Sequence, residues 1–135
     1  MALITWNNEL SVGIKEFDGQ HQKLIGMINE MYDALKAARG QDAIGSILPK
    51  LVEYTRSHFA SEEAQMRKHV YPGYVSHKAE HDALTAQVVE YAKRLEQGKG
   101  TAAVELMSFL KGWLTNHIQG VDKKYGPHLN GKGVV

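Results

Sequence analysis

The chain has 135 residues, of which 43% are hydrophobic and 23% charged, so it has the composition of a globular domain and not of a disordered or collagen-like chain. Lys and Arg total 16 against 15 Asp and Glu, and the net charge of +1 therefore does not point to a nucleic acid or an anionic membrane as a partner. Cysteine is absent, which excludes disulfides, thiolate zinc sites and cysteine-bound iron–sulfur clusters, and leaves nitrogen and oxygen as the donors for any metal.

This length predicts a single domain, residues 1–135. The first residues lack the basic and apolar regions of a signal peptide. No window approaches the ~18 apolar residues of a membrane span. We therefore expect a cytoplasmic protein without membrane insertion.

Clusters of glycine, proline and polar residues predict chain breaks at 39–42, 71–73, 97–100 and 126–127. In the first segment, apolar residues recur every three or four positions from Phe17 to Leu35, which predicts a helix with Asp18 as its N-cap. The second segment repeats this pattern from Ile44 to Met66. Pro49 is expected near the start of that helix, where proline is best tolerated.

The third and fourth segments have the same helical period. The third alternates steps of four and three from His77 to Leu95, and either Ser76 caps it or it begins as early as Pro72. In the fourth, which ends near His117, Thr101 is a candidate N-cap. Short connections force neighbouring helices to be antiparallel, so we predict an all-α, antiparallel, up-down-up-down four-helix bundle. Residues 1–16 are expected to form an irregular N-terminal arm and 126–135 an irregular C-terminal tail, of which the last residues, 131–135, are expected to be frayed.

Each predicted helix carries a histidine on the same stripe as its apolar residues. A single histidine there is most simply a hydrogen-bonded core residue, but five of them cost a few kcal/mol each if they are buried without partners. A shared metal site is the better explanation. The residues expected to face inward are His21, His58, His77, His81, His117, Glu62 and Asp122.

Seven donors are too many for one ion. They suit two octahedral ions joined by bridging carboxylates, and the donor types leave iron, zinc, copper and manganese open. Asp122 is the weakest candidate, because five residues after His117 in a regular helix is ~140° away from it. Gly120 lies between the two and allows the last turn to relax. Glu63 is expected to be a solvated group or a hydrogen-bond partner of a ligand, and His69 and His128 are left out of the site.

Four strings of residues carry a more specific signal: Asp18–His21, His58–Glu63, His77–His81, and Trp113–Ile118 followed by Asp122. In order and spacing they resemble the ligand motifs of the hemerythrin family in its single-domain form, over about residues 6–127. The resemblance implies one iron ion on His77, His81 and His117 and a second on His21 and His58. It further implies that Glu62, Asp122 and an oxo or hydroxo group bridge the ions, and that dioxygen binds at an open position of the second ion.

The resemblance also implies an oxygen pocket formed by Leu24, Phe59, Trp113 and Leu114, although each of these also suits an ordinary core. It implies reversible binding of dioxygen for storage, transport or delivery to an oxygen-consuming enzyme, by a protein that is not itself an enzyme. The helix pattern leaves no long apolar face for a partner, so we expect a monomer. An oxygen or redox sensor, a diiron oxidase, a ferroxidase and a peroxide-consuming enzyme are the alternatives, as is a structural zinc or manganese site. Ferritin-like enzymes use Glu-x-x-His motifs, and none of the ten glutamates here has a histidine three residues later.

Overall fold

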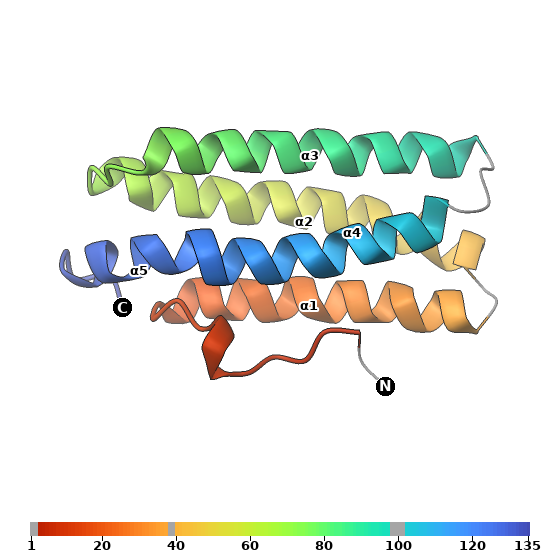
Figure 1. Ribbon diagram of the computed structural model, residues 1–135, viewed down its shortest axis with the longest axis horizontal. Coiled ribbons are helices and arrows are strands. Elements are labelled where there is room, and N and C mark those ends of the chain that lie inside the picture. Colours follow the sequence, from red (N-terminus) through yellow and green to blue (C-terminus); the bar gives the residue numbers. More distant parts are fainter. Residues whose placement is uncertain (1–2, 38–39, 98–101) are drawn as a thin grey trace.

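The computed structural model describes residues 3–37, 40–97 and 102–135, and of residues 40–44 it describes only the backbone. All the regular structure in these ranges is helical, and α1 contacts α2, α2 contacts α3, α3 contacts α4, and α4 returns to α1 (Figure 1). The predicted all-α antiparallel four-helix bundle is confirmed. Its elements are η1 (Asn8–Leu10), α1 (Lys15–Lys36), α2 (Gly40–Lys68), α3 (Tyr74–Glu96), α4 (Ala102–His117), η2 (Ile118–Asp122) and α5 (Lys123–Asn130).

The buried stripe of each helix contains both apolar side chains and histidines. In α3 the buried residues are spaced by four, three and four positions, the period with which one face of a helix repeats. The polar cluster therefore lies within the hydrophobic core and not at its edge. The buried residues are Phe17, His21, Leu24, Ile25, Ile28, Met31 and Ala34 in α1, His77, His81, Leu84 and Val88 in α3, and Ala102, Leu106, Met107, Leu110, Leu114 and His117 in α4.

Two predicted helix starts are wrong. Helix α2 begins at Gly40, so residues 40–42 do not break the chain and Pro49 is the tenth residue of the helix instead of a first-turn residue. Leu48 and Leu51 are buried on either side of it, and this packing overrides the local preference against proline. The break at 71–73 is confirmed, but α3 begins at Tyr74 after Gly73, so Ser76 does not cap it and Pro72 does not start it. Thr101 and the predicted break at 98–100 lie outside the described residues.

An N-terminal arm is present, but α1 begins at Lys15, so the predicted boundary at residue 16 is two residues too late; residues 3–14 include η1 and lie along the outside of α1 (Figure 1). Asp18 is not the N-cap of α1, since Ile14 holds that position. The Asp18 carboxylate instead accepts hydrogen bonds from Ser11 Oγ at 2.6 Å and from the backbone N–H of Val12 at 2.8 Å. The carboxylate therefore fastens the arm to the first turn of α1.

The prediction of an irregular tail is wrong for residues 126–130, because α5 continues through Gly126 and Pro127 to Asn130. A side chain at 126 would place its Cβ only 2.3 Å from the carbonyl oxygen of Val12, so this glycine allows α5 to lie directly against the arm. The Asn130 amide also donates to the carbonyl of Gly13 at 3.1 Å. Contacts with the arm therefore hold a segment whose local sequence predicts a break.

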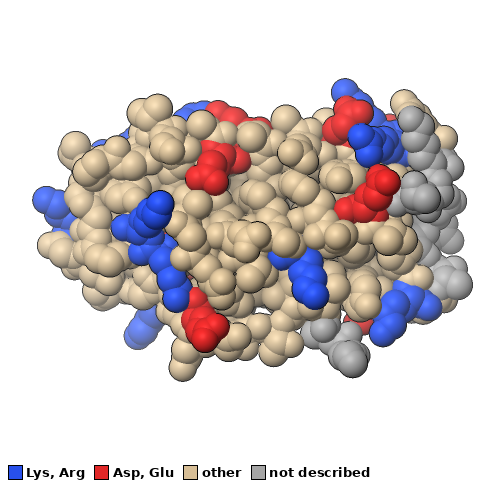
Figure 2. Space-filling view, viewed as in Figure 1, with Lys and Arg blue, Asp and Glu red and all other residues tan. Residues whose placement is uncertain are grey.

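Charged side chains of both signs are scattered over the face shown in Figure 2, with wide uncharged areas between them. None of the described helices combines the length and the hydropathy that a membrane-spanning segment needs.

Replacing Gly126 with alanine tests the contact between arm and tail. We expect Gly126→Ala to lower the free energy of unfolding by about 1–3 kcal/mol, the usual cost of overpacking, because the new methyl group collides with the Val12 carbonyl. Gly26→Ala is the matched control: a Cβ at Gly26, in α1, would meet nothing within 4 Å apart from its chain neighbours and the backbone of its own helix, so alanine should add about 1 kcal/mol there. Urea denaturation measures both, and a stabilised Gly126→Ala variant would contradict the packing described above.

Candidate metal centre

The structure brings together all seven side chains that the sequence predicted to face inward. They come from every helix of the bundle and from η2, and each is at most 4% exposed. Their donor atoms form two groups that share Glu62, and within each group the atoms lie within 4.8 Å of one another. One group is Glu62, His77, His81, His117 and Asp122, and the other is His21, His58 and Glu62.

Glu62 lies between histidines of both groups. Its Oε1 is 3.4 Å from His58 Nε2 and 3.3 Å from His81 Nε2, and its Oε2 is 3.4 Å from His21 Nε2. His58 and Glu62 are four residues apart on α2, which places both on one face of that helix. A carboxylate with imidazoles on both sides is placed as a bridging ligand would be.

Asp122 has the same relation to both groups. Its Oδ1 is 2.9 Å from His77 Nε2 and 3.0 Å from His117 Nε2, while its Oδ2 is 3.1 Å from His21 Nε2. A regular helix would turn Asp122 away from His117, but residues 118–122 form a π-helical turn. With i to i+5 hydrogen bonding, residues five apart lie about one turn apart, so the carboxylate faces inward. The expected relaxation of the last turn at Gly120 is confirmed.

Many donor atoms of this cluster are buried without a hydrogen-bond partner. Both ring nitrogens of His21, His77 and His117 are in this state, as are both carboxylate oxygens of Asp122. Each unpaired buried polar atom costs on the order of 1–3 kcal/mol, and metal coordination would remove this cost. Imidazole and carboxylate donors in this number suit first-row transition metals, so the residues fit the ions that the sequence predicted.

The charges within the cluster shift its pKa values in opposite directions. Burial lowers the pKa of His21, but the carboxylates of Asp122 and Glu62 outweigh burial and raise that pKa to about 9. Burial lowers the pKa of His58 to about 4. Burial alone would raise the pKa of Asp122, but contacts with His117, His21 and His77 hold it well below its usual value. Because His21 must be deprotonated to bind a metal, binding of an ion at this position would release a proton.

Three further side chains hold the ligands from outside. Gln20 Oε1 is 2.5 Å from His58 Nδ1, and Glu63 Oε2 is 2.9 Å from His81 Nδ1. Glu63 is therefore the hydrogen-bond partner that the sequence left as one of two alternatives. The Tyr125 hydroxyl donates to Glu62 Oε2, and burial raises the Tyr125 pKa well above its usual value, so this group stays a donor.

Sequence reasoning missed Gln20 and Tyr125. A signal for Tyr125 exists, since it follows Asp122 by three residues and so continues the inward face of the helix. His69 and His128 lie apart from the cluster, where His128 Nε2 is 2.7 Å from the His69 carbonyl oxygen. Neither of these two histidines belongs to either group of donor atoms.

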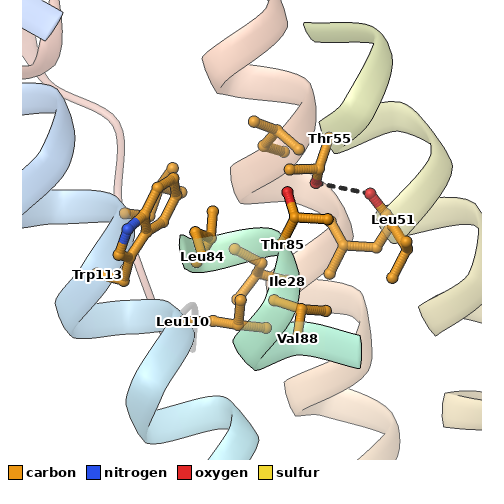
Figure 3. A pocket seen from close by; sticks show the side chains of 11 residues that line it. Ile28, Leu51, Thr55, Leu84, Thr85, Val88, Leu110 and Trp113 are labelled. Carbon is orange, nitrogen blue, oxygen red and sulfur yellow. Dashed lines mark hydrogen bonds between the residues drawn. The ribbon is translucent and has the colours of Figure 1, made fainter. Parts of the chain in front are cut away.

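An apolar cavity of about 20 Å³ lies one helical turn from the cluster, which is room for about one water-sized molecule (Figure 3). Leu24, Leu84 and Leu114, which line it, are each three residues from a histidine of the cluster, as is Thr55. Leu24 and Leu84 follow their histidines in the chain, whereas Thr55 and Leu114 precede theirs. Because α1 and α3 run antiparallel to α2 and α4, all four residues lie on the same side of the cluster along the bundle. The hydroxyl of Thr55 donates to the Leu51 carbonyl at 2.7 Å, so its polar group is satisfied within its own helix.

Three of the four residues predicted to form an oxygen pocket line this cavity: Leu24, Trp113 and Leu114. Phe59 does not, and it stacks instead on the ring of His81, with centroids 3.7 Å apart and planes at 5°. The physical reason is its position directly after His58, which turns it ~100° around α2 toward α3. Trp113 has both roles, since it also stacks on His117 at 4.6 Å.

Comparison with known proteins gives the family. The sequence profile of the Hemerythrin HHE cation binding domain matches residues 12–129. The chain belongs to the hemerythrin family. A bacteriohemerythrin from Stenotrophomonas maltophilia is 37% identical over 134 residues, covering 96% of this chain and 86% of the relative. One from Methylococcus capsulatus is 37% identical over 131 residues, covering 96% and 99%.

Solved structures agree with this assignment to the hemerythrin family. A crystal structure of wild-type hemerythrin superimposes with a TM-score of 0.86 at 38% identity, covering 95% of this chain and 98% of the other. A variant of hemerythrin gives a TM-score of 0.87 at 37% identity, covering 96% and 98%.

Removing metal from this hemerythrin-family domain is expected to lower its melting temperature. An ion present at a thousand times its dissociation constant stabilises the native state by about 4 kcal/mol. In a domain of this size that stabilisation raises the Tm by on the order of 10 °C. Calorimetry before and after chelation measures the difference.

His77→Ala should abolish most of the chelation effect, because its imidazole belongs to the larger donor group. His128→Ala, which alters a histidine outside the cluster, should keep it. Equal chelation effects and equal metal contents in the two variants would remove His77 from the site.

Proposed function

We propose that this chain binds dioxygen reversibly at a non-haem diiron centre, for storage, transport or delivery to an oxygen-consuming enzyme, and that it acts as a monomer without catalysing a reaction. The observation that carries the proposal is the buried arrangement of Glu62 and Asp122, each facing imidazoles of both groups, with an apolar cavity one turn away. Membership of the hemerythrin family supports iron as the metal.

The donors divide unequally between the two ions. His77, His81 and His117 would hold one ion, His21 and His58 the other, and Glu62 and Asp122 would bridge them beside an oxo or hydroxo group. Counting donors, the first ion would have six and the second only five, so one position would stay open for dioxygen. Two ferrous ions bound there would supply the electrons that reversible binding of dioxygen requires.

The remaining residues keep water and protons away. None of the side chains that line the cavity is ionisable, and the Thr85 hydroxyl donates to the His81 carbonyl at 2.9 Å instead of facing the space. Only two of the seven inward donors are carboxylates. This histidine-rich set differs from the four carboxylates of ferritin-like oxidases, which supports a carrier over an enzyme.

The deciding experiment is metal analysis followed by an anaerobic optical titration. The reduced protein should contain two iron ions per chain. Admitting oxygen should produce a visible charge-transfer band, and purging with an inert gas should remove it over repeated cycles. Immediate oxidation without a reversible band would contradict the carrier and favour an oxidase or a redox sensor. A protein purified without iron, or unable to take it up, would contradict the diiron centre.

Leu114→Ala tests the role of the cavity. Leu114 is 3% exposed and lines the cavity on α4. Truncating it enlarges the space and admits water, so the oxygenated protein should autoxidise faster while its iron content stays at two per chain.

Leu106→Ala is the matched control, because Leu106 is buried on the same helix without lining the cavity. The decay of the visible band measures both rates. If Leu114→Ala and Leu106→Ala autoxidise at the same rate, the cavity does not protect the centre.

A further inference from the structure

The hydrogen-bond acceptors on the outer sides of His58 and His81 differ in charge. Gln20, on α1, offers a neutral amide oxygen to His58 Nδ1 at 2.5 Å. Glu63, on α2, offers a carboxylate oxygen to His81 Nδ1 at 2.9 Å. His58 and His81 face the same oxygen of Glu62 at 3.4 and 3.3 Å, so the two rings are equivalent on their inner side and differ on their outer side.

Both outer partners are acceptors, and each therefore fixes the tautomer of its histidine. The proton stays on Nδ1 and the lone pair of Nε2 points into the cluster. A carboxylate accepts a stronger, charge-assisted bond than an amide does. The Glu63 carboxylate also raises the basicity of its imidazole more than the Gln20 amide does, so His81 is a stronger donor toward a metal ion than His58.

Hydrogen bonds to the other histidines of the cluster do not offset this difference in donor strength. The Nδ1 atoms of His21, His77 and His117 are buried without a hydrogen-bond partner. Within the described part of the chain, Glu63 is therefore the one carboxylate that accepts a hydrogen bond from Nδ1 of a histidine in the cluster.

Glu63 keeps contact with solvent on its other side. Its side chain is 14% exposed and lines an open cleft of about 320 Å³ between α2 and α3, together with Arg56, Asp82 and Thr85. Partial solvation lowers the cost of holding a charge beside the buried ring. The amide of Gln20 is neutral and needs no such solvation. The cleft lies on the His81 side of the cluster.

We propose that Glu63 and Gln20 make the two metal positions unequal: the carboxylate of Glu63 strengthens His81, so the three-histidine position fills first and stabilises the oxidised ion, while the neutral Gln20 leaves His58 the weaker donor. This inference rests on the two-ion site of the proposed function. Both residues are positioning residues, because each acts through a histidine.

Stepwise binding of Co²⁺ to the metal-free protein tests the inference, with anaerobic calorimetry for the affinities and the visible spectrum for the coordination. The unaltered protein should bind two ions in a tight and a weaker step. Glu63→Gln keeps the shape and removes the charge, and should weaken the tight step by about 10–100-fold while changing the weaker step less. Gln20→Glu should strengthen the weaker step, and the double exchange should bring the two affinities together.

Asp82→Asn is the matched control for charge. Asp82 lines the same cleft directly after His81, but its carboxylate bonds to Lys78 at 2.8 Å and not to the ring. It should change neither step. If Glu63→Gln weakens both steps equally, or behaves like Asp82→Asn, the inference is overturned.

The reduction potential of the iron-loaded protein is a second readout that a purely structural role of Glu63 would not move. Glu63→Gln should raise it, because the oxidised ion loses a nearby negative charge, and an unchanged potential would contradict the proposal. Binding of fewer than two Co²⁺ ions by the unaltered protein would overturn the two-ion site itself. Two ions with an unchanged ratio of affinities in Glu63→Gln would overturn this inference alone.

Discussion

The bundle is organised around five imidazoles and two carboxylates that it withdraws from water. Each of the seven side chains is at most 4% exposed, and many of their donor atoms lack a hydrogen-bond partner within the protein. Burying such a cluster in a hydrophobic core is unfavourable unless its polar atoms have partners, because unpaired polar atoms are costly at low dielectric. Bound cations would remove this cost, so the candidate metal centre lies within the hydrophobic core itself.

The last ligand depends on contacts far along the chain. The π-helical turn at 118–122 brings Asp122 inward, and α5 directly after it packs on the N-terminal arm through Gly126 and Asn130. Tyr125, fully buried between these contacts, donates to Glu62. The arm, which contributes no donor itself, thus helps to hold the Asp122 carboxylate in place and to orient that of Glu62.

The cluster has different surroundings on two sides. An apolar cavity lies one turn along the bundle, where the Thr55 and Thr85 hydroxyls bond to their own helices. An open cleft reaches Glu63 between α2 and α3. A neutral ligand such as dioxygen suits the first environment, whereas a charge that tunes a histidine suits the second because solvent stabilises it there. Phe59 stacks on His81 and lines this cleft but not the apolar cavity.

The sequence by itself determined the helices, their antiparallel order and the inward position of the histidines, because periods of three and four residues are local properties of a helix. The spacing of His117 and Asp122 even indicated that the last turn departs from a regular helix. Only the tertiary structure decided that Gly126 and Pro127 lie within a helix, that the ring on which Phe59 stacks is that of His81, and that Gln20 and Tyr125 bond to His58 and Glu62. These features depend on contacts between distant segments, such as Asn130 with Gly13, and local preferences carry no information about which distant segment will supply the packing or the hydrogen bond.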